Sequence, residues 1–498
     1  MSVPGEVCAG QLAHDGGAGH RRWLQRDLLH RLPQTWSERE YVCKTLDKAF
    51  ACAWEDGDHV LVGTKCNQLL RLDTLTGRSR AIPLPPAPPR ARETFDHEWG
   101  HCGIHSIALS PARRLVATGG DNPADAVVLD RATWRPVATL VGHLDWVFGL
   151  AWLSDAHLVT ASRDASVGLW TLPEEAVLGD GAGQDEADAA ADGEEEARAG
   201  GVRPEARVGG VRPGAGAGGA GPGAGAGGAG PGAGAGGAGP GAGAGGAGPG
   251  AGAGGAGPGA GTEAATPATP AASGLVLTKD YGRHGDFRKS FGGKVRGVEY
   301  DAATRTLATL SLEGAVRLHD PGDNLRLIRR IDLKPRNAGE ELVCLALTPS
   351  FAAAGRQTDV VLMDTRTRRG AMTIIPSPDA TVGVRSVSVQ DDLVSFGTGA
   401  GKLCFFDVRA GKLLDRAARR EAAVGQYHTP ALLAPLPFAL ETGPGWLDQN
   451  QTYWDHFANT RVQHACYAHA WDPAAQRVFA CGGPLAFGMR GCYMGLWR

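Results

Sequence analysis

The sequence predicts an all-β protein, a seven-bladed β-propeller, because one pattern recurs seven times along the chain. In each copy an alternating apolar segment is followed by a turn of small residues, a second alternating segment and a third that ends near Trp or Asp. The clearest copy runs from Gly142-His143 through Trp152 and Ser162-Arg163-Asp164 to Trp170. Period-two alternation indicates strands, and this repeat is typical of a WD40-type propeller blade.

The length of the chain supports the same architecture. Of the 498 residues, about 100 between positions 173 and 273 are dominated by Gly, Ala, Pro and Glu, which leaves about 400 for a folded body. Seven blades of about 40–45 residues with a few long loops fill that length as one domain. A propeller usually presents binding surfaces, so its function depends on which side chains the ring of blades brings together.

The segments before the first blade are predicted to be short. Residues 1–20 are Gly-rich and are expected to be disordered. Over residues 21–37 apolar side chains, among them Trp23 and Leu28, recur at helical spacing until Pro33 ends the pattern. This spacing predicts a short amphipathic helix.

The blades are expected on either side of a long insertion. Blades one to three are assigned to residues 38–172 and blades four to seven to residues 274–498. The chain stops after a third strand of blade seven, so the outer strand of that blade must come from elsewhere. The stretch from Arg39 to Thr45 is well placed to supply it, closing the ring and removing two exposed sheet edges.

Residues 173–273 are predicted to form a disordered insertion that is acidic at first and then rich in Gly, Ala and Pro. The segment carries 12 acidic residues and four arginines, a net charge of −8, so the rest of the chain contributes +5 to the total of −3. From Pro213 to Pro258 a proline recurs every nine residues, in a repeat that lacks the strict Gly spacing of collagen. This composition favours a flexible coil.

Strand parity predicts a cluster of cations on one face of the propeller. In an antiparallel blade the start of the first strand and the turn between the second and third strands lie at the same edge. The basic residues at such positions are Lys48, Lys65, Arg163, Lys294, Arg296 and Arg385. Six cations around the channel mouth, with few acids nearby, favour an anion-binding site. A chain terminus with flanking acidic side chains is a natural ligand.

The same residues have plainer interpretations when each is taken alone. A single surface cation is usually solvated and contributes little to stability. Asp164, next to Arg163, is a candidate structural acid that pairs with His143 and Ser162, as in many such blades.

The opposite face carries two Asp-x-Arg steps in adjacent blades. Third strands end in Asp364-Thr365-Arg366 and Asp407-Val408-Arg409, and the same parity places both at the far edge. One interpretation is an Asp–Arg pair that holds a turn. Two such steps in consecutive blades also resemble the WDxR feature of substrate receptors for cullin-four ubiquitin ligases, with Met363 and Phe406 in place of Trp.

The sequence favours a protein that is not an enzyme, with no cofactor and no metal. It contains no Gly-x-Ser-x-Gly motif and no Walker loop. Cys102-x-x-His105 and Cys466-x-x-His469 are each half of a metal site and are expected to be buried or neutral residues. No signal pattern and no uncharged apolar run approaching ~18 residues is present, so we expect a cytoplasmic or nuclear protein without a membrane segment.

Several blocks of the sequence closely resemble one family. They are Thr45–Phe50, Val62–Asn67, Cys102–Ile107, Ala117–Pro123, Ser162–Asp164, Gly397–Gly399 and Cys481–Trp497. These blocks are similar to the DDB-one- and cullin-four-associated factor twelve family and its paralogues. The similarity covers about Leu32 to Arg498, except the insertion and the loop 410–442.

The resemblance implies a function and assigns residues to it. Members of that family are substrate receptors of a cullin-four RING ubiquitin ligase and recruit proteins that end in acidic residues, typically two glutamates. The ligand-binding basic residues of the family correspond to the six cations that strand parity selects. Contact with the DDB-one adaptor is expected through the helix, with Trp23 and Leu28, and through Arg366 and Arg409 on the opposite face.

Two other functions remain open. A protein-interaction scaffold could bind acidic C-termini without any link to the ligase, and adaptor co-purification would separate it from a receptor. Nucleic-acid binding through the cations is unlikely, because the rim is expected to lack interleaved aromatic residues. It would predict a steep salt dependence and no preference for free carboxyl termini.

Overall fold

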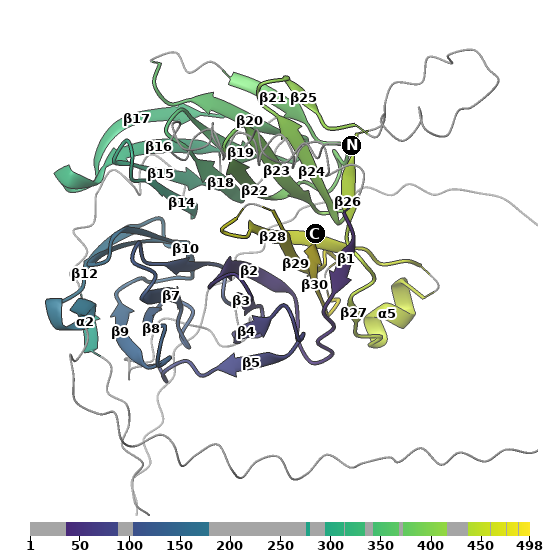
Figure 1. Ribbon diagram of the computed structural model, residues 1–498, viewed down its shortest axis with the longest axis horizontal. Coiled ribbons are helices and arrows are strands. Elements are labelled where there is room, and N and C mark those ends of the chain that lie inside the picture. The colour runs from purple at the N-terminus through teal and green to yellow at the C-terminus, as the bar shows by residue number, and fades with distance from the viewer. Residues whose placement is uncertain are drawn as a thin grey trace, which may run out of the picture. The chain divides into compact units, whose positions relative to one another are not determined.

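The computed structural model describes residues 36–87, 103–178, 275–278, 294–333, 342–367, 372–415 and 437–498, apart from positions 313, 459, 475 and 487. The predicted disordered N-terminus at 1–20, the helix at 21–37 up to residue 35, and the insertion at 173–273 beyond residue 178 lie outside these ranges. The described strands form seven sheets (Figure 1). The predicted seven-bladed propeller is therefore confirmed.

Blades one to three occupy the first half of the described chain. Blade one contains β2 (Ala49–Trp54), β3 (His59–Thr64), β4 (Leu69–Asp73) and β5 (Ser79–Ile82). Blade two contains β6 (Ile107–Leu109), β7 (Leu115–Gly119), β8 (Ala126–Asp130) and β9 (Pro136–Val141). Blade three contains β10 (Val147–Ser154), β11 (His157–Ser162) and β12 (Val167–Thr171).

Blades four to six follow the insertion, each with strands in antiparallel order. Blade four contains β14 (Val295–Asp301), β15 (Thr306–Ser311), β16 (Ala315–Asp320) and, after the short η2 (Pro321–Asp323), β17 (Arg326–Asp332). Blade five contains β18 (Cys344–Leu347), β19 (Phe351–Gly355), β20 (Asp359–Asp364) and β21 (Met372–Pro376). Blade six contains β22 (Val384–Gln390), β23 (Leu393–Thr398), β24 (Lys402–Asp407) and β25 (Lys412–Leu413), and β26 (Ala439–Glu441) also pairs with β24.

Blade seven joins the two ends of the described chain. It contains β28 (His464–Trp471), β29 (Val478–Pro484), β30 (Gly491–Trp497) and β1 (Glu38–Glu40), and β27 (Trp446–Leu447) also pairs with β30. The purple β1 lies beside the yellow β30 in Figure 1, with Glu38 opposite Trp497. The predicted ring closure is confirmed, although its extent was wrong: the strand ends at Glu40. Tyr41 is buried and its hydroxyl donates to the Thr74 carbonyl at 2.7 Å, so the chain turns toward blade one.

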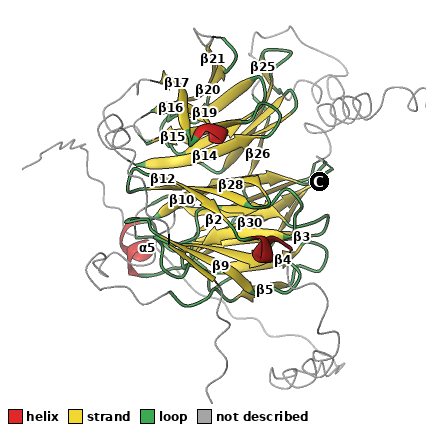
Figure 2. Ribbon diagram, turned by 90° about the vertical axis from the view of Figure 1, so that its left-hand side faces the viewer, coloured by secondary structure: helices red, strands yellow, loops and turns green. Residues whose placement is uncertain are grey.

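One strand pairing and two short helices were not foreseen. β13 (Leu275–Thr278) follows the insertion but pairs in parallel with β9 of blade two, not with blade three. Two short helices, α2 (Glu174–Leu178) and α5 (Gln451–His456), accompany the strands, and Figure 2 shows how little of the described chain is helical. None of the helices in the described ranges is long and apolar enough to cross a membrane.

The core lies between neighbouring sheets and around the ring. The first strand of each blade packs against the first strand of the next, in the order β2, β6, β10, β14, β18, β22, β28 and back to β2. Between blades one and two, Leu61, Ile104 and Leu129 are fully buried, and burial of each such side chain contributes about 1.5–3 kcal/mol. A Cβ at Gly63 would lie 2.4 Å from the Ile104 side chain, so this approach requires glycine.

Candidate functional site: the mouth of the central channel

Backbone hydrogen bonds place the predicted cations at one edge of the sheets. The Lys65 amide donates to the Lys48 carbonyl at 2.8 Å, which ties the turn after β3 to the residue before β2. The Arg163 amide donates to the Trp146 carbonyl at 2.8 Å in blade three. In blade four the Leu312 amide donates to the Lys294 carbonyl in the same way. These bonds place Lys48, Lys65, Arg163 and Lys294 at the strand edges that parity predicts.

A cavity of about 700 Å³ occupies this part of the channel and is lined by the first strands of all seven blades. Of the six predicted cations, Lys48, Lys65, Arg296 and Arg385 line it. Arg163 and Lys294 lie at the same edge but are not part of its wall. The structure thus brings four of the six together.

One residue of every blade projects into the cavity at an equivalent position. In five blades the register of the first strand shifts across a bulged residue, namely Phe50, Phe148, Arg296, Arg385 or Tyr467. A β-bulge leaves one residue unpaired and redirects its side chain. His105 and Val343 hold the corresponding places in blades two and five. We call Phe50, His105, Phe148, Arg296, Val343, Arg385 and Tyr467 the channel ring.

Four of the seven channel-ring side chains are aromatic, those of Phe50, His105, Phe148 and Tyr467. Phe50 stacks on His105 with ring centroids 4.6 Å apart and planes 9° apart. Tyr467 meets Phe50 edge-on at 5.2 Å, and Phe148 meets His105 edge-on at 5.0 Å. The expectation that the cations lack interleaved aromatic residues is therefore wrong. Bulges bring these side chains together from positions far apart in the sequence.

The arginines at the mouth are held by their neighbours. The guanidinium of Arg296 lies 3.9 Å from the centroid of Phe148. Arg385 donates from Nε and Nη2 to the Val382 carbonyl at 3.2 and 3.0 Å. Arg163 lies over Trp146 at 4.6 Å and pairs with Asp145 at 3.5 Å. These contacts fix the arginines before any ligand arrives, which lowers the entropy cost of binding.

The two lysines share one acid. Lys65 Nζ lies 2.9 Å from Asp47, whereas Lys48 is buried. Burial lowers the pKa of Lys48, the nearby Lys65 lowers it further, and Asp47 partly offsets both. Lys48 also has a positive φ of 23°, an uncommon backbone conformation for a residue with a Cβ. The expectation of few acids near the cations is wrong at Asp47 and Asp145.

An acidic side chain also lines the cavity. Glu299 follows Arg296 by three residues on β14, is solvent-exposed and lines the cavity. Protein surrounds this part of the channel, and the resulting desolvation raises the pKa of Glu299 to about 7. The sequence offered no signal for it, because a polar residue on a strand usually faces bulk solvent.

The opposite face carries Arg366 and Arg409, each about two-thirds exposed. Arg366 pairs with Asp364 of the same step at 3.2 Å, whereas Arg409 lies 3.8 Å from Asp392. Both aspartates of the steps accept hydrogen bonds from turn amides, those of Arg366 and Arg409. These residues have the turn-holding role of the plainer interpretation, and their guanidinium groups remain accessible. Trp23 and Leu28 lie outside the described residues.

Other polar clusters serve the interior of the blades. Asp164 lies 3.1 Å from His143 Nδ1, as predicted, but its hydroxyl partner is Ser166; Ser162 instead accepts from the Asp164 amide. His469 lies 2.8 Å from the hydroxyls of both Ser386 and Ser395, and burial lowers its pKa to about 4. It is therefore a neutral core histidine and not half of a metal site.

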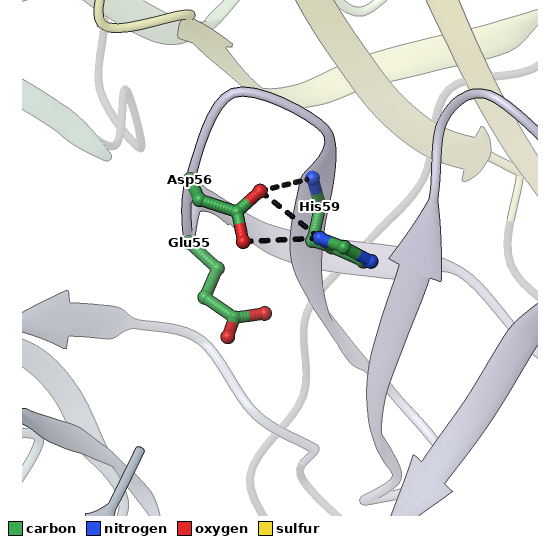
Figure 3. Close-up of side chains that lie close together, drawn as sticks. All are labelled: Glu55, Asp56 and His59. Atoms are coloured by element: carbon green, nitrogen blue, oxygen red, sulfur yellow. Dashed lines mark hydrogen bonds and ion pairs between the residues drawn. The ribbon is translucent and has the colours of Figure 1, made fainter. Parts of the chain in front are cut away.

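Glu55, Asp56 and His59 gather at the turn between β2 and β3 (Figure 3). Asp56 accepts from the amide of His59 at 2.8 Å and contacts its Nδ1 at 3.0 Å, while Glu55 pairs with Arg71 at 2.6 Å. All three groups already have partners, so the cluster is explained by the turn.

One metal motif was not expected. The run His97-Glu98-Trp99-Gly100-His101 has the spacing that holds zinc when it lies on a helix. The expectation of no metal did not take this run into account. The run lies outside the described residues, as does Cys102.

Comparison with known proteins gives one match over most of the chain. The family described as "DDB1- and CUL4-associated factor 12 beta propeller" matches residues 32–204 and 287–498.

Matches to individual proteins are shorter. The protein transport protein SEC13 of Candida albicans is 42% identical over 72 residues, 13% of this chain and 24% of that protein. Protein transport protein sec13 of Emericella nidulans is 31% identical over 108 residues, 16% of this chain and 35% of that protein. The chain thus spans about a quarter to a third of these relatives. The solved structure of U3-55K is 12% identical with a TM-score of 0.48, covering 92% of this chain and 98% of that one.

Proposed function

The chain belongs to the DDB1- and CUL4-associated factor 12 β-propeller family, and on that basis we propose that it is a substrate receptor of a cullin-four ubiquitin ligase that binds acidic C-termini at the channel mouth. The family name links such propellers to DDB1 and CUL4.

The main evidence for an acidic ligand is that four cations line one cavity. Lys48, Lys65, Arg296 and Arg385 approach it from blades one, four and six. A cavity of about 700 Å³ is in the size range of small-ligand pockets, so it suits the end of a chain better than a folded surface. A free C-terminus with acidic side chains brings several carboxylates to one point. Charge-assisted hydrogen bonds from arginine and lysine favour that arrangement.

The aromatic side chains of the channel ring already contact one another and Arg296, which argues against nucleic acid as the ligand. One face of Phe50 is covered by His105, and a face of Phe148 is covered by Arg296. Base stacking on single-stranded nucleic acid needs an open aromatic face. The aromatic side chains are better placed to hold the arginines and to contact apolar parts of a peptide.

The adaptor is proposed to bind the opposite face. Arg366 and Arg409 are exposed there, and their turns are held by Asp364 and Asp407. The helix predicted at 21–37, with Trp23 and Leu28, would add apolar contacts. Co-purification of purified DDB1 with the full chain tests this part, and failure to bind would leave a scaffold without a ligase link.

Peptide titration tests the ligand. A labelled peptide ending in Glu-Glu should bind the full chain, and the same peptide with an amidated C-terminus should bind at least tenfold more weakly, because one charge-assisted hydrogen bond contributes about 1.5–3 kcal/mol. Equal affinity of the two peptides would show that the free carboxylate is not recognised.

A further inference from the structure

Glu299 introduces a negative charge into a cavity whose wall is otherwise cationic. It lies three residues after Arg296 on β14, about 10 Å further along the strand at ~3.3 Å per residue. Two residues of an extended peptide span ~7 Å. A chain end held by Arg296 and extended along β14 would place a carboxylate within about 3 Å of Glu299 along the strand direction. A carboxylate that met an ionised Glu299 there would be repelled.

The strands packed against β14 bring few titratable groups to the cavity near Glu299. The elements packed against β14 are β10, β11, β15 and β18. Among their cavity-lining residues the only titratable group is the Cys344 thiol, whose pKa burial raises to about 12. The other titratable or charged groups that line the cavity are Arg296 and Tyr300 on β14, and, across it, Lys48, Cys52, Lys65, His105, Arg385, Tyr467 and His469. Burial lowers the pKa of His469 to about 4 and raises that of Tyr467. No ion pair between Glu299 and another described residue offsets its charge.

We propose that Glu299 is part of the peptide site and acts there as a protonated acid, donating a hydrogen bond to a carboxylate of the bound acidic terminus. This rests on the proposed function of the cavity. The carboxylic O–H is the donor and the ligand carboxylate is the acceptor, a pairing that gives short, strong hydrogen bonds. Binding of an acidic terminus is then coupled to uptake of one proton by Glu299.

The coupling has a definite sign. The ligand stabilises protonated Glu299, so it raises the pKa of this group, and affinity falls as pH rises through neutrality. Below about pH 6 Glu299 is already protonated and affinity levels off. A pKa rise of one unit on binding corresponds to tenfold in affinity, so we expect a loss of about three- to tenfold between pH 6 and pH 8.

Calorimetry measures the proton directly. A peptide ending in Glu-Glu is titrated into the full chain near pH 7 in phosphate and in Tris, two buffers with different ionisation enthalpies. The wild-type protein should take up a large fraction of one proton per peptide. Glu299→Gln keeps the shape and a hydrogen-bond donor, and it should remove the uptake and the loss of affinity at pH 8. Glu174→Gln, an exposed position on α2, is the matched control and should behave as wild type.

The possible outcomes distinguish a wrong role for Glu299 from a wrong peptide site. If neither protein binds the peptide in any buffer, the proposed peptide site is wrong. If both bind with equal proton uptake, the site stands and the role of Glu299 is overturned. Uptake that persists in Glu299→Gln but disappears in His105→Gln would assign the proton to the histidine, which also overturns the role of Glu299.

Discussion

The two faces of the propeller use charged residues in different ways. At the channel mouth, bulges in the first strands direct Arg296 and Arg385 toward a shared cavity, where both could bind the same anionic ligand. On the opposite face, Asp364 and Asp407 accept hydrogen bonds from their own turns, and the arginines two residues later point outward. One face is therefore concave and built to enclose a small anionic group. The other is a set of separate exposed contacts suited to a protein surface.

The difference also separates binding charges from structural ones. Asp47, Asp145 and Asp364 each lie within 3.5 Å of a basic partner, so those cations are partly neutralised. Arg296 and Arg385 are instead positioned by an aromatic ring and a carbonyl, and both line the cavity. We therefore expect these two arginines to dominate binding.

The largest effect on peptide affinity is expected from reversing the charges of Arg296 and Arg385. Arg296→Glu with Arg385→Glu should weaken binding of a peptide ending in Glu-Glu by about 100-fold or more, because two charge-assisted hydrogen bonds are replaced by repulsion. Fluorescence anisotropy checks this. Arg366→Glu with Arg409→Glu makes the same charge change on the opposite face and should leave affinity unchanged. Loss of binding in this control would mean that the two faces are not independent.

The interior of blade seven should respond to acid. Burial lowers the pKa of both His464 and His469 to about 4, from an ordinary value near 6.5. The unfolded chain binds protons at these histidines between pH 6.5 and 4 while the folded chain does not, so stability falls as pH falls through that window. The expected loss is about 3 kcal/mol per histidine.

Urea denaturation at pH 7 and pH 4.5 measures that loss. His464→Gln should reduce the dependence on pH, whereas His157→Gln, at an exposed position of β11, should leave it unchanged. If the unfolding free energy of His464→Gln depends on pH as strongly as that of the wild type, His464 is not a buried neutral histidine. This stability change runs opposite to the pH dependence expected for peptide binding, so the two can be distinguished.

A smaller effect is expected on the opposite face. Arg366→Ala with Arg409→Ala should weaken DDB1 binding several-fold, because exposed ion pairs each contribute about 0.2–1 kcal/mol and the helix that the sequence predicts at 21–37 would still add contacts. Surface plasmon resonance with purified DDB1 checks this. Peptide affinity should not change, and an equal fall in both affinities would erase the distinction between the faces.

The smallest effect is expected at Arg163. Its guanidinium stacks on Trp146, pairs with Asp145 and does not line the cavity, so Arg163→Ala should reduce peptide affinity only two- to threefold, as expected for a screened peripheral charge. Titration at low and high salt checks this. A loss as large as that of Arg385→Ala would extend the site to blade three.

Much of this architecture could be predicted from the sequence. The strand repeat fixed the number of blades, and parity placed Lys48 and Lys65 at the same edge. The channel ring could not be predicted, because alternation does not reveal which residue of a strand is bulged. Phe50 and Tyr467 therefore resembled ordinary core positions. Nor could the sequence distinguish Arg163, which pairs with Asp145, from Arg385.

Photo-crosslinking tests the location of the peptide site most directly. A peptide ending in Glu-Glu, with a benzophenone side chain at the third residue from its end, is irradiated with the full chain, and the adducts are mapped by mass spectrometry. The account predicts adducts on the cavity wall, near Phe50, Phe148 and Tyr467, that vanish with Arg296→Glu and Arg385→Glu. Adducts that map to the turns after Asp364 and Asp407, or that persist in the double variant, would contradict it.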